Sequence, residues 1–333
     1  MVPLKYLAPF TFLALLPLGG WLGGAWTFIA AAATPLCLTT LDTAAGEAKP
    51  PSGHTRGTAP RWLPRIYIVL QLAATSWAAA WAARPATSLF EAAGMALSVG
   101  VTTGVFGFVA AHEMIHSRSR YERALGLALL GSVFYMHFRI AHVYGHHRRA
   151  ATFEDPATAR LGEGLYAFLV RSVAGQFREA WTFEARRRGV GLDNRMVQYL
   201  AIEASLLVAI ALIDIRALAF LAAVAVSAVA LLEAFNYVAH YGLTRIAVAD
   251  GRPERLGPRH SWNTGKRMNN AALFNMGRHS DHHRRMTRSY ERLERLGGEA
   301  ELPSGYAAAL LTALVPSLWR RVMDPRAKAA MTR

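Results

Sequence analysis

The sequence predicts an all-α integral membrane protein with about six transmembrane helices and a cytoplasmic helical cap that carries four histidine clusters. Three observations support this prediction. Hydrophobic residues make up 53% of the 333 residues, and they gather in runs long enough for a helix to cross a bilayer. Nearly all Lys and Arg residues lie between these runs. Nine of the twelve histidines lie in short motifs outside the runs.

The first apolar stretch, residues 6–41, is about twice as long as one spanning helix requires. Gly19, Gly20, Gly23 and Gly24 interrupt it near the middle, so we expect a helical hairpin of 6–22 and 25–41. The other predicted spans are 66–83, 89–111, 197–213 and 217–238. We expect residues 1–333 to form one domain, organised as a hairpin (6–41), helices three and four (66–111), a first histidine-bearing segment (112–196), helices five and six (197–238), and a second histidine-bearing segment with an amphipathic C-terminus (239–333).

Two further apolar runs are too short to span a bilayer. Residues 124–138 are expected to form a re-entrant or surface-lying helix. The run from Tyr306 to Trp319 is also short, and Pro316 interrupts it. We therefore assign both runs to the histidine-bearing segments and not to the transmembrane helices.

The basic residues predict the orientation in the membrane. If the N-terminus is inside, every Lys and Arg except Arg84 and Arg216 falls on the inner side, out of 37. Cytoplasmic loops favour Lys and Arg, so both termini and all the histidine clusters are predicted to be cytoplasmic, in a multi-pass protein of a bacterial inner membrane.

Composition excludes several classes of protein. The single cysteine, Cys37, excludes a disulfide framework and a cysteine-ligated metal cluster. The net charge of +15 is explained by topology and not by nucleic-acid binding, because no binding module accompanies it. The first apolar run lacks a cleavage site and is interpreted as a retained helix.

The histidine motifs have the spacing of metal ligands. They are His112-x-x-x-His116, His142-x-x-x-His146-His147, a single His240, and His279-x-x-His282-His283. Residues three or four apart share a helix face, so each pair can point at one ion. Adjacent histidines point about 100° apart on a helix and can serve two neighbouring ions.

Nine imidazoles exceed the needs of one ion and predict a two-metal site. Spacing alone does not choose between zinc, copper, iron and nickel. We expect the isolated residues His54, His137 and His260 to play no part in it.

These motifs, in this order, resemble those of the membrane alkane hydroxylases, within the histidine-box di-iron hydroxylases and desaturases. The segments Trp262-Asn-Thr, Glu154-Asp-Pro-Ala157 and Leu302-Pro-Ser-Gly-Tyr306 also match the pattern of that family, and the resemblance covers roughly 89–325. Three residues separate His142 from His146, whereas desaturases usually have two.

The resemblance implies an alkane 1-monooxygenase with two non-haem iron ions, held by the nine histidines of the four motifs, that uses O2 on an apolar substrate from the bilayer. It also implies rubredoxin and rubredoxin reductase as electron donors. No catalytic residue beyond the metal ligands is predicted, and the membrane lipids are the other expected partners.

The sequence departs from the family at two positions. Ala141 and Ala239 replace glutamates that usually precede a ligand histidine, which puts substrate choice, iron affinity and rate in doubt. Glu113 and Asp281 are the candidate outer carboxylates, and Glu233 lies nearby.

Other functions stay open from the sequence. The enzyme could act on an aryl methyl group or an acyl lipid. A metal transporter or sensor is the alternative outside enzymes, but it would place its ligands near the bilayer midplane. The glycines Gly94, Gly100, Gly104 and Gly107 could line a substrate path, although close helix packing is the simpler interpretation.

Overall fold

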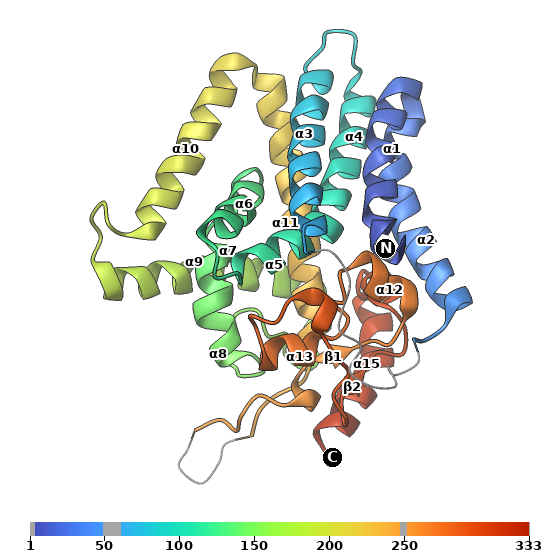
Figure 1. The fold of residues 1–333 in the computed structure, drawn as a ribbon, viewed down its shortest axis with the longest axis vertical. Helices are drawn as coiled ribbons and strands as arrows, with labels where there is room; N and C mark the ends of the chain where they lie inside the picture. Colours follow the sequence, from blue (N-terminus) through green and yellow to red (C-terminus); the bar gives the residue numbers. More distant parts are fainter. Residues whose placement is uncertain (1–3, 49–60, 247–251, 333) are drawn as a thin grey trace.

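In the computed structural model, which describes residues 4–48, 61–246 and 252–332, long helices form one half of the molecule and the histidine-bearing segments form the other (Figure 1). The predicted spans correspond to α1 (Ala8–Leu22), α2 (Ile29–Ala45), α3 (Leu63–Ala82), α4 (Leu89–Thr102), α10 (Arg195–Ile213) and α11 (Ile215–His240).

Four helical segments have the length and apolar composition needed to cross a membrane. They are Gly24–Ala45, Leu89–Ile115, Arg195–Ile213 and Ile215–His240. The second of these joins α4, a π-helical turn and α5 (Phe108–Ile115) into one continuous helix that ends at the first histidine motif. α1 has 15 residues, fewer than the about 20 of a simple span, and it packs with α3 against α4.

Local sequence explains where the helix Leu89–Ile115 begins and how closely it packs. Ser88 and Glu91 form a reciprocal cap at its N-terminus, and the Glu91 carboxylate also accepts a hydrogen bond from the Gly24 backbone N–H at 2.8 Å. A Cβ atom at Gly100 would lie 1.9 Å from the Ser227 Oγ on α11. Glycine at this position therefore lets α4 and α11 approach closely, as the packing interpretation predicts.

Neither short apolar run forms a helix of spanning length. The first gives α6 (Arg120–Gly131), a turn in which Phe134 has a φ of 55°, and the short helix α7 (Phe138–Ile140). The second is divided into α14 (Tyr306–Ala313) and α15 (Pro316–Met331), and Pro316 is the first residue of α15.

The histidine-bearing half is built from short elements and one long helix, α9 (Leu165–Arg188), which was not predicted from the sequence (Figure 1). The other elements are α8 (His147–Arg149), α12 (Arg267–Ala272), α13 (His279–Arg284), and the two-residue parallel strands β1 (Trp262–Asn263) and β2 (Ala300–Glu301). Two short 3-10 turns, Pro258–His260 and Tyr290–Arg292, connect them.

Candidate metal centre

Four segments far apart in sequence bring the nine motif histidines together. His112 lies in α5, and His116 directly follows that helix. His142 and His146 lie in a π-helical turn, Ala141–His146, and His147 begins α8. His240 is the last residue of α11, and the remaining three lie in α13.

The histidines form two groups, each with ligand atoms within 4.8 Å of one another. The five-histidine cluster consists of His112, His116, His142, His147 and His282. The four-histidine cluster consists of His146, His240, His279 and His283. Each adjacent pair, 146–147 and 282–283, is divided between the two clusters, as the 100° step of a helix predicts.

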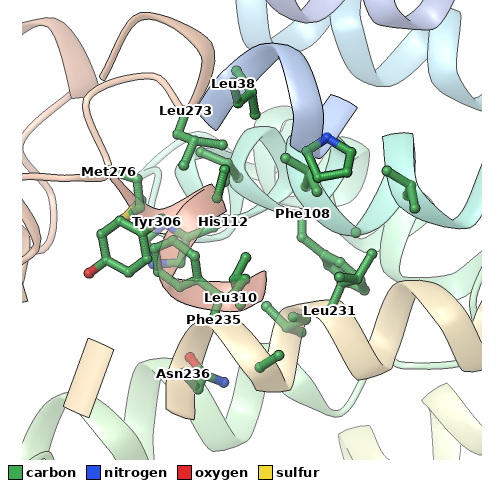
Figure 2. Close-up of a pocket in the computed structure, with 18 of the residues that line it drawn as sticks. Leu38, Phe108, His112, Leu231, Phe235, Asn236, Leu273, Met276, Tyr306 and Leu310 are labelled. Atoms are coloured by element: carbon green, nitrogen blue, oxygen red, sulfur yellow. The ribbon is translucent and has the colours of Figure 1, made fainter. Parts of the chain in front are cut away.

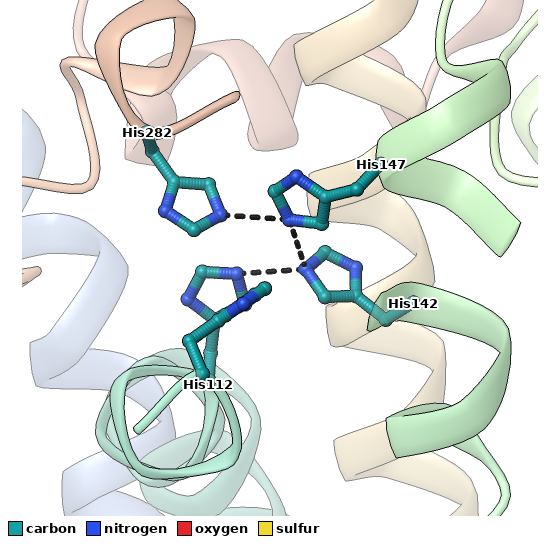
Figure 3. Close-up of side chains that lie close together, drawn as sticks. His112, His142, His147 and His282 are labelled. Carbon is teal, nitrogen blue, oxygen red and sulfur yellow. Dashed lines mark hydrogen bonds between the residues drawn. The ribbon is translucent and has the colours of Figure 1, made fainter. Parts of the chain in front are cut away.

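Four members of the five-histidine cluster, His112, His142, His147 and His282, point their imidazoles toward one another (Figure 3). His112 Nε2 lies 2.9 Å from His142 Nε2, which lies 3.1 Å from His147 Nε2, which in turn lies 3.0 Å from His282 Nε2. In the four-histidine cluster, the Nε2 atoms of His240, His279 and His283 are separated pairwise by 3.1 Å.

These separations match the edges of a metal coordination shell. Two neighbouring imidazole nitrogens at right angles, each about 2.1 Å from an ion, lie about 3.0 Å apart. His116 Nε2 and His146 Nε2 are buried and have no hydrogen-bond partner among the described residues. Buried nitrogens without partners are costly, so convergent lone pairs of this kind fit metal ions.

Burial favours the neutral form of five cluster imidazoles. Burial, reinforced by neighbouring imidazoles, lowers the pKa well below its ordinary value for His142, His147, His279, His282 and His283. Neutral imidazole is the form that binds a metal ion.

Two imidazoles of the four-histidine cluster are oriented by hydrogen bonds to residues that are not part of the cluster. His146 Nδ1–H donates to Asp155 Oδ2 at 2.8 Å, and His240 Nδ1–H donates to the His260 carbonyl at 3.3 Å. Asp155 is held in turn by the Thr158 hydroxyl at 2.6 Å. Burial raises the pKa of Asp155, but His146 and Thr158 outweigh it and the net shift is downward. A carboxylate partner of this kind fixes the tautomer and raises the basicity of a ligand histidine.

Sequence reasoning missed the role of Asp155. It lies in the Glu154-Asp-Pro-Ala157 turn, nine residues after His146. This turn was recognised as part of the family pattern, but the contact of Asp155 with His146 was not predicted. The two carboxylates named in advance make other contacts. Glu113 accepts a hydrogen bond from the Tyr290 backbone N–H at 3.1 Å, and Asp281 accepts one from Arg288 at 3.0 Å.

The isolated histidines lie outside both clusters where the structure describes them. His137 is buried against the rings of Tyr135 and Phe177. The His260 side chain contacts Glu254, with 3.2 Å between Nε2 and Oε1, so only its backbone serves the site. His54 lies outside the described residues.

An apolar cavity of about 300 Å³ reaches the histidines from the long helices (Figure 2). Its wall includes His112 and His142 of the five-histidine cluster and His279 of the four-histidine cluster. The remaining wall is mostly aliphatic and aromatic, drawn from α2, α4, α5, α11 and α14. Leu97, Leu311 and Leu314 line the cavity and are exposed.

A second cavity, of about 500 Å³, is lined mostly by polar and charged residues. His116 lies in its wall together with Arg61, Arg65, Arg118 and Arg292. The five-histidine cluster is thus bordered by an apolar cavity and by a basic one.

Comparisons with known proteins agree with this architecture. The fatty acid desaturase family model matches residues 86–310. The alkane 1-monooxygenase of Pseudomonas putida is 38% identical over 273 residues, which are 80% of this chain and 68% of that protein. Alkane 1-monooxygenase 1 of Pseudomonas aeruginosa is 41% identical over 243 residues, 71% of this chain and 64% of that protein.

A more distant relative acts on a different substrate class by its name. The hydroxylase component of the xylene/toluene monooxygenase of Pseudomonas putida is 30% identical over 240 residues, 69% of this chain and 62% of that protein. The chain spans about two thirds of the length of these relatives, between 62% and 68%. On the family match and the identity to the alkane 1-monooxygenases, the chain belongs to the membrane-bound alkane hydroxylase family.

Proposed function

We propose that this protein is an oxygen-dependent hydroxylase of an apolar substrate, the terminal carbon of an alkane, and that it acts at a non-haem di-iron site held by the nine clustered histidines. The observation that carries the proposal is the apolar cavity, whose inner end is lined by histidines of both clusters. A substrate chain in this cavity would present its end to both candidate metal positions.

The reaction replaces a C–H bond with a C–OH bond and releases one water molecule, consuming one O2, two electrons and two protons. Iron ions bound by the clusters would supply the oxygen activation that this chemistry requires. The protein's own residues would hold the chain and exclude water. The side chains of Phe138, Phe235 and Leu310 line the cavity beside the histidines, so they would restrain the chain end close to them.

We propose that the electrons come from a separate donor protein or domain, rubredoxin reduced by its reductase. Among the described residues, the groups that could hold a metal ion are the nine clustered histidines, and one cysteine cannot hold an iron–sulfur centre. The basic rim of the polar cavity beside His116 is complementary to an acidic donor.

For the location we propose a six-span protein of the bacterial inner membrane, with the metal site and both termini cytoplasmic. The charge distribution supports this proposal, since Arg84 and Arg216 are the only basic residues on the opposite side. Reporters fused after residues 86 and 215 should read outside, and one fused at the C-terminus inside. An outside reading at the C-terminus would contradict the arrangement.

A related substrate class remains the second candidate, because the xylene/toluene relative is 30% identical. The test is product analysis with the purified protein, a reduced rubredoxin and a panel of alkanes, methylarenes and acyl lipids. We expect terminal alcohols from the alkanes. Benzylic alcohols alone, or a new double bond in an acyl chain, would replace the alkane proposal with the corresponding alternative.

A further inference from the structure

Glu233 is a buried carboxylate whose hydrogen-bond donors do not belong to either histidine cluster. It lies on α11, seven residues before His240, and its side chain is fully buried. Its Oε2 accepts hydrogen bonds from Ser172 at 2.6 Å, Gln176 at 2.8 Å and Asn236 at 3.3 Å, and its Oε1 accepts one from the Tyr135 hydroxyl at 3.0 Å. None of these donors is a cation.

A carboxylate in such a place is costly, because the hydrogen bonds that replace water come from neutral groups. The Glu233 carboxylate joins separate segments, because its four hydrogen-bond donors belong to three parts of the chain. Ser172 and Gln176 lie on α9, Asn236 lies on α11, and Tyr135 lies in the turn between α6 and α7. An acceptor-only group can satisfy all four donors at once, whereas an amide would place its own N–H groups among them.

The turn that contains Tyr135 leads directly to the second histidine motif. The Phe138 backbone N–H donates to the Tyr135 carbonyl at 3.1 Å. The Phe138 ring stacks on the His142 ring, with centroids 4.8 Å apart and an interplanar angle of 23°. Both Phe138 and His142 line the apolar cavity, so a contiguous set of contacts joins Glu233 to the place where substrate would meet the metal ligands.

We propose that Glu233 is a positioning residue: through Tyr135 it fixes the Phe138 ring between the apolar cavity and His142, and so selects the carbon that is oxidised. This inference rests on the proposed function for its substrate readout. A change in the placement of Phe138 would alter both the orientation of the His142 imidazole and the shape of the cavity beside it.

A second buried carboxylate provides a matched control. Glu203 on α10 contacts the same turn, but it accepts its hydrogen bond from the Met136 backbone N–H, at 2.8 Å, and not from the Tyr135 hydroxyl. A glutamine at position 203 can still accept this bond through its side-chain carbonyl. Glu203→Gln therefore tests loss of a buried carboxylate at the turn without disturbing the Tyr135 contact.

The experiment compares Glu233→Gln, Tyr135→Phe and Glu203→Gln with the parent protein. We expect all four proteins to bind equal amounts of metal. With alkanes and a reduced donor, Glu233→Gln and Tyr135→Phe should lower kcat by about ten-fold or more and raise the share of subterminal alcohols, because small displacements at a reacting centre have large effects on rate. Glu203→Gln should keep the parent's product distribution.

A readout that is independent of turnover separates this inference from the proposed function. In cobalt-loaded protein, the visible ligand-field bands should shift in Glu233→Gln and Tyr135→Phe, by no more in the double variant than in either single variant. They should stay unchanged in Glu203→Gln. If the parent makes no oxygenated product, the proposed function fails and the cobalt spectra alone decide.

Spectra and products of Tyr135→Phe that match the parent would overturn the inference, even if Glu233→Gln does not fold. Equal changes in Glu203→Gln would overturn it as well, because the carboxylates would then serve only to hold the turn in place.

Discussion

The two histidine clusters differ in how firmly their surroundings hold them. In the four-histidine cluster, His146 is oriented by Asp155 and His240 by the carbonyl of His260. Two Nδ1 atoms in each cluster, those of His112 and His147 and those of His279 and His283, have no hydrogen-bond partner within the part of the chain that the structure describes. The clusters therefore differ in the contacts of His146 and His240 and not in the number of unpaired Nδ1 atoms.

The clusters differ in access as well. The five-histidine cluster borders the apolar cavity through His112 and His142 and the polar cavity through His116, whereas the four-histidine cluster borders the apolar cavity through His279. The difference indicates a division of roles. The four-histidine cluster has fewer ligands, and groups outside the cluster orient two of them. The five-histidine cluster has one more ligand and borders both cavities, through which substrate and electrons would arrive.

Ligand removal should have the largest effect and should differ between the clusters. His282→Ala leaves four imidazoles in its cluster, a number that still suffices for a closed site, whereas His283→Ala leaves three. We expect both variants to lose activity, and His283→Ala to lose more iron, measured by mass spectrometry.

His54→Ala is the control and should change little. Equal iron loss in His282→Ala and His283→Ala would contradict the asymmetry between the clusters.

Removal of outer support should have the next largest effect. Asp155→Asn retains an acceptor for the His146 N–H but removes the charge, so iron affinity at the four-histidine cluster should fall about 10- to 100-fold. Release of about half the iron at low chelator concentration would show this.

Asp281→Asn is the matched control, because Asp281 pairs with Arg288 and Arg285 and not with a cluster histidine. Chelation curves that are alike for Asp155→Asn and the parent would argue against a role for Asp155.

Added outer support should have a smaller effect. Ala239→Glu restores the glutamate usual in the family beside His240, but the His240 N–H already donates to the His260 carbonyl and position 239 is fully buried. We expect a folded protein with modestly altered turnover or product distribution. Kinetics and products identical to those of the parent would show that a glutamate at position 239 does not affect the reaction.

Donor docking should have the smallest effect, confined to one kinetic constant. Arg284 is exposed directly after the fourth motif, while Arg285 pairs with Asp281 and Glu294. Arg284→Glu should raise the donor concentration for half-maximal rate, with iron content unchanged, because transient redox partners are steered by complementary charge. Added salt should produce the same change in the parent. If neither change affects donor dependence, docking lies elsewhere.

The sequence was informative for features that depend on helical spacing or on the length of an apolar run. Helical spacing correctly predicted that His112 and His116 can point together, that His279 can do so with one of the two histidines that follow it, and that residues 282 and 283 would serve different clusters. The same rule was wrong for His142 and His146, which fall in different clusters. These two residues lie in a π-helical turn, where the spacing of an α-helix does not apply. Hydrophobic length predicted that residues 306–319 would not span, and the break falls before Pro316.

Contacts between distant segments could not be predicted in this way. The Asp155–His146 bond depends on a turn that folds back over nine residues, and no local period encodes such a return. Glu233 meets Tyr135 across 98 residues, and no sequence pattern indicated α9, whose apolar face is interrupted by polar residues. The number of membrane-spanning helices could not be predicted from apolar length alone either. The first predicted span forms α1, which is shorter than a typical transmembrane helix.

The iron content of the purified protein tests the central claim most directly. Two clusters of imidazole nitrogens, each within 4.8 Å, predict close to two irons per chain in metal analysis of the parent protein. The same analysis should find a clear loss of iron in His283→Ala. One zinc per chain with no iron, or an iron content that does not depend on the clustered histidines, would contradict the account.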